Sequence, residues 1–250
     1  MAVSLSPTKS SCRPVACDSC CLNIFCLPLD LEGQDKAHLH ELHIRNGSIA
    51  KGEYLYQAGE TDAMLYAVRS GCVKTSIISS TGQEHITGFS LPGEFVGLGS
   101  LTSPVYTTNA EALETTHYCA TSFERIKALT KQAPGFTQHI FGKLTEEINK
   151  GENTAIMLSQ KSAEQRLASF LVNLSYRYQL RGFSPVEFKI SMSRNDIGKY
   201  LSLAVETVSR HFTRFQKQQL IETNGRFVKL LAPEQLQSIA GLTQQRKLGG

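Results

Sequence analysis

Residues 193–210 read Ser-Arg-Asn-Asp-Ile-Gly-Lys-Tyr-Leu-Ser-Leu-Ala-Val-Glu-Thr-Val-Ser-Arg, and this stretch decides the fold of the C-terminal third of the chain. Ser193 is a favoured helix N-cap, and Asp196 three residues later suits the positive end of the same helix. A turn is expected near residues 202–203, and a second helix from about Val205 to Gln219. The stretch therefore predicts two short helices joined by a tight turn.

The segments on both sides of these helices complete a larger motif. The preceding helix has one apolar face, formed by Leu167, Phe170, Leu171, Leu174 and Tyr178. Apolar residues at positions 188, 190 and 192 alternate with polar ones, as in a half-buried strand. After the second helix, Asn224-Gly225 predicts a hairpin between residues 220–221 and residues 227–230. This order of elements is typical of a winged helix–turn–helix domain.

The second helix of such a pair enters the DNA major groove. Glu206 and Arg210 lie four residues apart and therefore share a face, where a carboxylate can accept from cytosine N4 and a guanidinium can bridge guanine O6 and N7. Ser209 offers a hydroxyl beside Arg210, and Thr207 lies in the same turn. The opposite, buried side is expected to hold Val208, Phe212 and Phe215. An exposed Glu–Arg pair is common on helices and contributes only about 0.3–0.5 kcal/mol, but in this motif it predicts base readout.

Charge is divided unevenly along the chain. Residues 1–161 contain 13 basic and 16 acidic side chains, a net of −3, whereas residues 162–250 contain 13 and 6, a net of +7. A basic C-terminal third on a mildly acidic body suggests a polyanion-binding module attached to a part with another role. No apolar run is long enough to span a bilayer and no signal peptide is indicated, so a cytoplasmic location without a membrane partner is expected.

The region from about residue 49 to residue 122 has the sequence pattern of an all-β domain. Its strand-like runs are Tyr54–Tyr56, Leu65–Val68, Val73–Ile78, His85–Phe89 and His117–Cys119. The breaks between them fall at Gly52, Gly59, Gly71, Gly82 and Gly93. Turn signals about every ten residues predict a barrel or jelly roll.

Helical periodicity replaces this pattern from about Pro134. Small and apolar residues recur at alternating spacings of three and four, at Phe141, Leu144, Ile148, Gly151, Ala155 and Leu158. This spacing is that of a coiled-coil seam. With Ile140, these residues form the predicted dimer interface; packing of the helix on its own β domain is the alternative.

Seven cysteines stand at positions 12, 17, 20, 21, 26, 72 and 119, five of them close together near the N-terminus. In a reducing cytosol such groups bind metal more often than they form disulfides. Cys17, Cys20 and Cys26 form the pattern C-x₂-C-x₅-C. Short spacings suit both iron–sulfur and structural zinc sites, and spacing alone leaves the two open.

Glu206-Thr207-Val208-Ser209-Arg210, within the stretch that starts at Arg194, resembles the helix–turn–helix of the cyclic-AMP receptor/FNR superfamily. It is most similar to the FNR branch, the fumarate-and-nitrate-reduction regulators, and the resemblance runs from Cys17 to about Leu231. It implies an α+β chain with an N-terminal double-stranded β-helix sensor domain (a jelly roll of the cyclic-nucleotide-binding type), a long dimerisation helix and a C-terminal winged helix–turn–helix. The corresponding segments are 1–29 (cysteine-rich), 30–131, 132–160 and 161–250.

The resemblance also implies a cofactor and partners. The FNR pattern takes its fourth ligand from a distant cysteine of the β-roll, so one [4Fe–4S] cluster per subunit would be held by Cys17, Cys20, Cys26 and Cys119. The implied partners are a second copy of the chain, RNA polymerase and a palindromic double-stranded operator of the type TTGAT-N₄-ATCAA. At the position of Val205, the cyclic-AMP receptor has an arginine that reads a G·C pair. This chain has a valine there, as FNR does, and a valine suits a T-rich half-site. Oxygen-sensitive regulation, mainly activation with repression at some promoters, would be the function.

Several positions depart from the family pattern or stay outside it. Cys12, Cys21 and Cys72 are interpreted as non-ligands. Residues 95–110 contain no arginine to pair with a cyclic phosphate, and Leu98 stands where a ribose-binding glutamate would be expected, so no cyclic nucleotide is expected. By resemblance, polymerase contacts are expected near residues 81–88 and 181–185.

Two other classes of protein would share some of these sequence features. An iron–sulfur enzyme or electron carrier would need a substrate pocket or second cofactor, and the sequence contains neither a Gly-rich nucleotide loop nor a catalytic-triad pattern. A regulator of the same superfamily that responds to zinc or a small effector is the second alternative. We therefore expect a regulator and no enzymatic activity.

Overall fold

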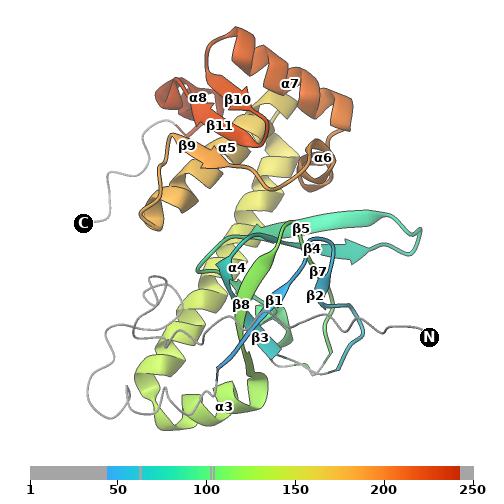
Figure 1. Ribbon diagram of the computed structural model, residues 1–250, viewed down its shortest axis with the longest axis vertical. Coiled ribbons are helices and arrows are strands. Elements are labelled where there is room, and N and C mark those ends of the chain that lie inside the picture. The colour runs from blue at the N-terminus through green and yellow to red at the C-terminus, as the bar shows by residue number, and fades with distance from the viewer. Residues whose placement is uncertain (1–43, 62–63, 102, 104, 243–250) are drawn as a thin grey trace, which may run out of the picture.

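The computed structural model describes residues 44–61, 64–101, 103 and 105–242. A β domain and a mainly helical domain lie at opposite ends of the molecule, and the long helix α4 (Pro134–Gln160) runs between them (Figure 1). Across these described ranges, no helix combines the length and apolarity needed to cross a membrane.

The β domain consists of two four-stranded sheets. Its strands are β1 (Arg45–Ile49), β2 (Tyr54–Tyr56), β3 (Met64–Ser70), β4 (Val73–Ile78), β5 (Glu84–Ser90), β6 (Phe95–Val96), β7 (Asn109–Ala112) and β8 (Thr116–Ser122). The sheet orders are β1-β8-β3-β6 and β2-β7-β4-β5, and neighbouring strands are antiparallel. A single 3₁₀ turn, η3 (Leu98–Ser100), follows β6. The two facing sheets form the predicted jelly roll.

The glycines that predicted the turns are structural requirements. Gly52, Gly59, Gly71, Gly82 and Gly93 all have φ between 78° and 93°. At Gly71, which joins β3 to β4, an added Cβ would lie only 2.7 Å from the carbonyl oxygen of Thr115. A side chain there would be strained by the backbone angle and by this contact.

Helices α3 (Phe123–Gln132) and α4 pack against the end of the β-roll. Their shared core cluster contains Leu65, Leu98, Phe123, Ile126, Leu129, Ala133, Phe136 and Ile140. The assignment of Ile140 to an exposed dimer seam is therefore wrong, because its side chain is 4% exposed and packs inside its own chain. The alternative, packing of the helix on its own domain, holds for this first part of α4.

The C-terminal domain has the predicted helix, strand, helix–turn–helix and hairpin, with a shorter strand than predicted and a final helix that was not predicted. They are α5 (Ala163–Leu180), β9 (Glu187–Lys189), α6 (Arg194–Leu201), α7 (Val205–Lys217), β10 (Ile221–Asn224), β11 (Phe227–Leu230) and α8 (Pro233–Ile239). The three strands form a sheet in the order β10-β11-β9. Helix α7 ends two residues before the predicted Gln219, because Gln219 has a φ of 56° and leaves the helical conformation.

Ser193 and Asp196 start α6 by a capping box. The Ser193 hydroxyl accepts from the backbone N–H of Asp196, and the Asp196 carboxylate accepts from the backbone N–H of Ser193. A close approach then fixes the turn between α6 and α7, since a Cβ at Gly198 would lie 2.7 Å from the Leu203 carbonyl oxygen. These local contacts explain why the stretch folds as two helices at a fixed angle.

Arg166 connects α4, α5 and α6. Its guanidinium donates to three backbone carbonyl groups, those of Leu158 (2.7 Å), Lys161 (2.9 Å) and Leu201 (3.0 Å). The carbonyl groups at helix C-termini lack partners within the helix and attract cations. One side chain from α5 therefore ties the end of α4 to the end of α6.

We predict that Arg166→Met lowers the free energy of unfolding by about 2–4 kcal/mol, because three charge-assisted hydrogen bonds are lost in a half-buried site. Chemical denaturation followed by circular dichroism measures this change. Arg226→Met, which removes an exposed arginine of the β10–β11 hairpin, is the matched control and should change stability by less than about 0.5 kcal/mol. Equal effects of the two substitutions would contradict the assigned role of Arg166.

Candidate nucleic-acid interface and cysteine site

Helix α7 separates a buried side from a polar, outward side. Val208, Phe212 and Phe215 are buried, with exposed fractions of 0%, 2% and 0%, as predicted. On the other side Glu206, Ser209 and Arg210 are exposed, and Thr207 is half-buried. The helix lies at the outer edge of the domain (Figure 1). The side chains predicted to read bases thus lie on an accessible face of the second helix of the motif.

Arg194 joins the two helices of the motif. Its guanidinium carbon lies 3.2 Å from the centre of the Phe212 ring, a cation–π contact. Burial lowers the pKa of Arg194 to about 10, so the side chain still carries its charge at neutral pH. This contact between α6 and α7 was not predicted, because Arg194 and Phe212 carry no sequence signal of being neighbours.

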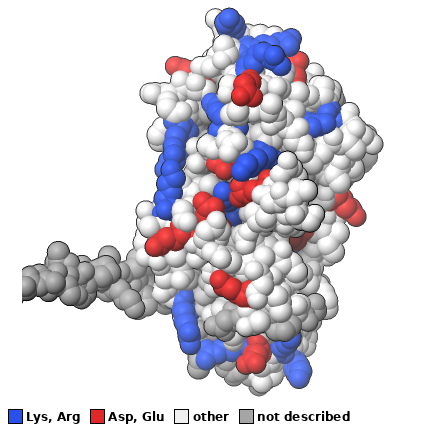
Figure 2. All heavy atoms as spheres, turned by 90° about the vertical axis from the view of Figure 1, so that its right-hand side faces the viewer, with Lys and Arg blue, Asp and Glu red and all other residues white. Residues whose placement is uncertain are grey.

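Basic side chains lie along α7 and on the β10–β11 hairpin that follows it. The exposed ones in this part of the chain are Arg210, Arg214, Lys217, Arg226 and Lys229. Figure 2 shows Lys and Arg gathered at the upper end of the molecule, where Figure 1 places this domain. A cationic surface around a major-groove helix provides the sequence-independent attraction to phosphates on which base readout depends.

Cys119, the predicted distant metal ligand, lies in the middle of β8. Its side chain is half-buried, and its thiol donates a hydrogen bond to Asn46 Oδ1 at 3.2 Å. Asn46 is its register partner on β1, the strand by which the chain enters the β-roll after residue 43. Cys119 therefore lies beside the first strand of the described part of the chain.

The other three predicted ligands, Cys17, Cys20 and Cys26, lie outside the described residues, as do Cys12 and Cys21. About twenty residues separate Cys26 from β1, and a chain of that length can reach across the whole domain. Within residues 44–61, 64–101, 103 and 105–242, no group of three or more His, Cys, Asp and Glu could hold a metal ion. The described residues therefore offer no complete metal site around Cys119, and a set of four thiols that included the predicted N-terminal cysteines would suit either an iron–sulfur cluster or zinc.

Cys72 is in a different environment. Its side chain is 0% exposed and belongs to the core between the two domains. Burial raises the pKa of the Cys72 thiol, which opposes formation of the thiolate that metals need. Cys72 is thus unsuited to be a ligand.

Comparison with known proteins places these features in a family. One family model, the cyclic nucleotide-binding domain, matches residues 47–133, and another, the Crp-like helix-turn-helix domain, matches residues 165–239. The transcriptional activator protein Anr of Pseudomonas protegens is 46% identical over 225 residues, which are 90% of this chain and 92% of the relative. The chain belongs to the FNR-type transcription regulators.

Other relatives agree with this assignment. The fumarate and nitrate reduction regulatory protein of Vibrio cholerae is 38% identical to this FNR-type regulator over 233 residues, 93% of each chain. The solved structure of FixK2 from Bradyrhizobium japonicum has a TM-score of 0.74 at 27% identity and covers 79% of this chain and 98% of its own. The relatives named Anr and fumarate and nitrate reduction regulatory protein are transcription regulators, and with the matched Crp-like helix-turn-helix domain they make this regulator a DNA-binding protein of that kind.

We predict that Arg210→Ala weakens binding to the expected TTGAT palindrome by about 1–3 kcal/mol, roughly five- to 150-fold, because the variant cannot make the expected bidentate contact to guanine. Fluorescence anisotropy at fixed salt, on the palindrome and on an unrelated duplex, measures both affinities. Arg214→Ala is the control one helical turn further on, and it should weaken both duplexes alike. An equal loss on both duplexes with Arg210→Ala would mean that Arg210 contacts only phosphate.

Proposed function

We propose that this FNR-type regulator is a cytoplasmic, global regulator of anaerobic transcription that senses oxygen through one [4Fe–4S] cluster per subunit. Its ligands would be Cys17, Cys20, Cys26 and Cys119. The observation that carries the proposal is the position of Cys119, half-buried on β8 beside the strand that follows the cysteine-rich segment. The 38–46% identity to proteins named transcriptional activator Anr and fumarate and nitrate reduction regulatory protein supports it.

When bound, a [4Fe–4S] cluster supplies an oxygen-reactive centre that requires four thiolates to converge. Cys119 is suited to transmit its state, because β8 ends at Ser122 and α3 begins at Phe123. Phe123 and Ile126 of α3 share a core cluster with Phe136 of α4. A restraint on β8 can therefore influence the packing of the long helix.

The outer face of α4 is where a second copy of the chain would bind. Phe141 and Ile148 are 63% and 62% exposed, and Gly151 and Ala155 of the predicted seam are also exposed. Leu144 and Leu158 are half-buried, each against a core cluster of its own chain. Large apolar side chains aligned along one helix expose apolar area that an identical helix would cover. We propose this face as the homodimer interface.

A dimer paired along α4 would present two copies of α7 to two half-sites. The predicted operator, TTGAT-N₄-ATCAA, has the two-fold symmetry that such a dimer needs. Activation further implies contact with RNA polymerase, for which the turn between β4 and β5, near residues 81–88, remains our candidate. In the other expected contact region, residues 181–185, the Arg181 side chain is unsuited to contact the polymerase, because it is 6% exposed and ion-paired inside the molecule. Phe183 and Ser184 of this loop are exposed.

The β-roll interior supports the proposal that no cyclic nucleotide is bound. Tyr56 and Tyr106 are buried, and their rings stack at 3.7 Å between centroids. Leu98, at the position expected for a ribose-binding glutamate, is buried in an apolar cluster. Aromatic and aliphatic groups offer no compensation for a buried phosphate charge.

We predict that Cys119→Ser, purified without oxygen, loses its iron and sulfide together with tight operator binding, because one of four thiolates is missing. Metal and sulfide analysis, the visible spectrum and anisotropy with operator DNA are the measurements. Cys72→Ala is the matched control and should retain all three properties. Retention of iron and sulfide by Cys119→Ser would refute the ligand assignment, and a colourless wild-type protein with one zinc per chain would favour a zinc-stabilised regulator instead.

We predict that Ile148→Asp shifts the anaerobic protein to monomers, because two carboxylates would face each other in an apolar interface. A loss of about 3 kcal/mol changes the dimerisation constant more than a hundredfold. Analytical ultracentrifugation measures the constant. Ile78→Asp, at a 52% exposed position on the β-roll, is the control and should leave dimerisation unchanged; an unaltered constant for Ile148→Asp would remove α4 from the interface.

A further inference from the structure

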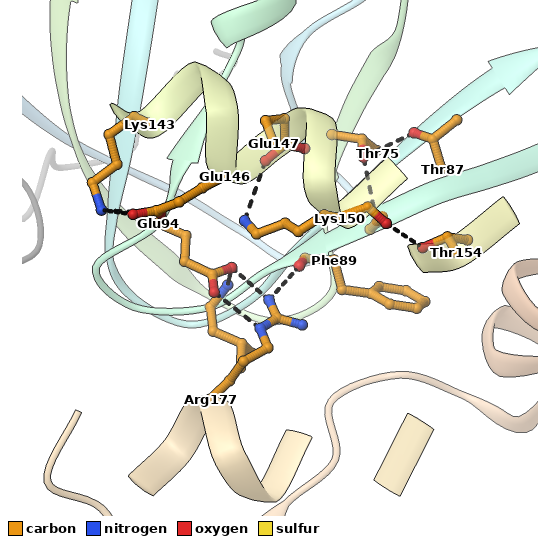
Figure 3. Close-up of polar contacts among 12 residues, drawn as sticks. Thr75, Thr87, Phe89, Glu94, Lys143, Glu146, Glu147, Lys150, Thr154 and Arg177 are labelled. Carbon is orange, nitrogen blue, oxygen red and sulfur yellow. Dashed lines mark hydrogen bonds and ion pairs between the residues drawn. The ribbon is translucent and has the colours of Figure 1, made fainter. Parts of the chain in front are cut away.

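A buried carboxylate lies between the β-roll and the DNA-binding domain. Glu94, on the turn between β5 and β6, accepts a hydrogen bond from Arg177 Nε at 2.9 Å and one from Arg181 Nη2 at 2.6 Å. Figure 3 shows its carboxylate facing the guanidinium of Arg177 on α5. We call Glu94, Arg177 and Arg181 the Glu94 triad; their side chains are 9%, 16% and 6% exposed.

The two arginines also bind the backbone of the same turn. Arg177 Nη2 donates to the Phe89 carbonyl at 2.6 Å, and Arg181 Nε donates to the Pro92 carbonyl. A hydrogen bond within the turn also stabilises its conformation, since the Leu91 N–H donates to Glu94 Oε2 at 3.0 Å. Hydrogen bonds with specific geometry thus attach the end of α5 to both ends of one tight turn of the β-roll.

Apolar contacts surround this point. Phe89 of β5 contacts the rings of Phe170 and Tyr200, at centroid distances of 6.2 Å and 5.2 Å. Ile86 and Leu91 belong to the same core cluster as the buried face of α5. Burial of apolar area stabilises the contact between the domains but depends little on their relative orientation. The hydrogen bonds of the Glu94 triad have specific geometry and therefore fix the angle between the two domains.

A second group of charges restricts rotation about this contact. Lys199 of α6 binds Glu84 of β5 at 2.6 Å, and Lys74 of β4 binds the same carboxylate at 3.0 Å. Lys74 also lies 3.9 Å from Asp196, in the capping box of α6. Since α6 and α5 are each attached to the β-roll, the DNA-binding domain is held at two separate points.

We propose that Glu94 is a positioning residue for DNA binding: through Arg177 and Arg181 it makes the β-roll and the DNA-binding domain of one subunit move as a single body. The distance between the two copies of α7 is then set by the pairing of α4 alone. This inference rests on the dimeric, DNA-bound function proposed above. It places the regulated movement between subunits, and no hinge opens within a subunit.

The arrangement of charges and exposed residues supports this view. Glu206, Ser209 and Arg210 stay exposed while the triad is closed, so docking leaves the reading face open. Burial would raise the pKa of Glu94, but Arg177, Lys150 and Arg181 lower it to about 2. A lowered carboxyl pKa contributes stability that is present above the unfolded-state pKa near 4.5 and is lost as the pH falls toward about 2. The triad therefore stays charged throughout the neutral range.

The test compares Glu94→Gln with Glu94→Asp, with Glu60→Gln, at an exposed β-roll carboxylate, as control. We expect Glu94→Gln to dimerise normally in ultracentrifugation but to bind the TTGAT palindrome at least tenfold more weakly, with little change on unrelated DNA. Hydrogen–deuterium exchange should increase in the β5–β6 turn and in the last turn of α5. Glu94→Asp should restore part of the affinity, and the control should match wild type.

Two outcomes separate failure of this inference from failure of the proposed function. A monomeric wild-type protein on operator DNA would refute the dimer, whereas a normal dimer with unchanged operator affinity in Glu94→Gln would overturn the positioning role. If Glu94→Gln does not fold, Arg177→Lys keeps the charge and loses the paired contacts. It should fold and lose several-fold in operator affinity; wild-type affinity together with faster exchange would also overturn the inference.

Discussion

The buried face of α5 is the contact on which the rest of the molecule depends. Leu167, Phe170, Leu171 and Leu174 are at most 4% exposed, and they share one core cluster with residues of both domains. Burying each such side chain stabilises the fold by about 1.5–3 kcal/mol. The helix thus supports the recognition motif on one side and contacts the β-roll on the other. The two domains of one chain therefore share a core.

Polar contacts around this core fix the relative orientation of the helices and domains that meet there. Arg166 ties the ends of α4 and α6 together, and the Glu94 triad attaches the end of α5 to one turn of the β-roll. Removal of one partner from such a buried group costs more than the pair contributes, because the remaining charge is left without compensation. The orientation of α7 relative to α4 is therefore fixed by a few specific groups.

The C-terminal domain and the β-roll differ in charge and in the chemistry of their candidate functional residues. The side chains that we expect to contact DNA lie on the basic C-terminal domain, where the apolar side of α7 is buried and its polar side is exposed. The β-roll carries Cys119 on the strand that runs directly into α3 and α4. A sensor placed there acts on the helix that we propose for dimerisation, at a distance from the DNA contacts.

The sequence by itself determined what depends on neighbours along the chain. Glycines marked the turns, Ser193 and Asp196 marked the start of α6, and helical spacing identified the buried side of α7; the structure confirms all three, which follow local rules. Tertiary structure decided where a helix meets another element. Ile140 is buried because α3 and the β-roll cover it, and Arg177 meets Glu94 across 83 residues of chain. The periodicity of the sequence cannot predict such a contact, because its partners are brought together only when the domains pack.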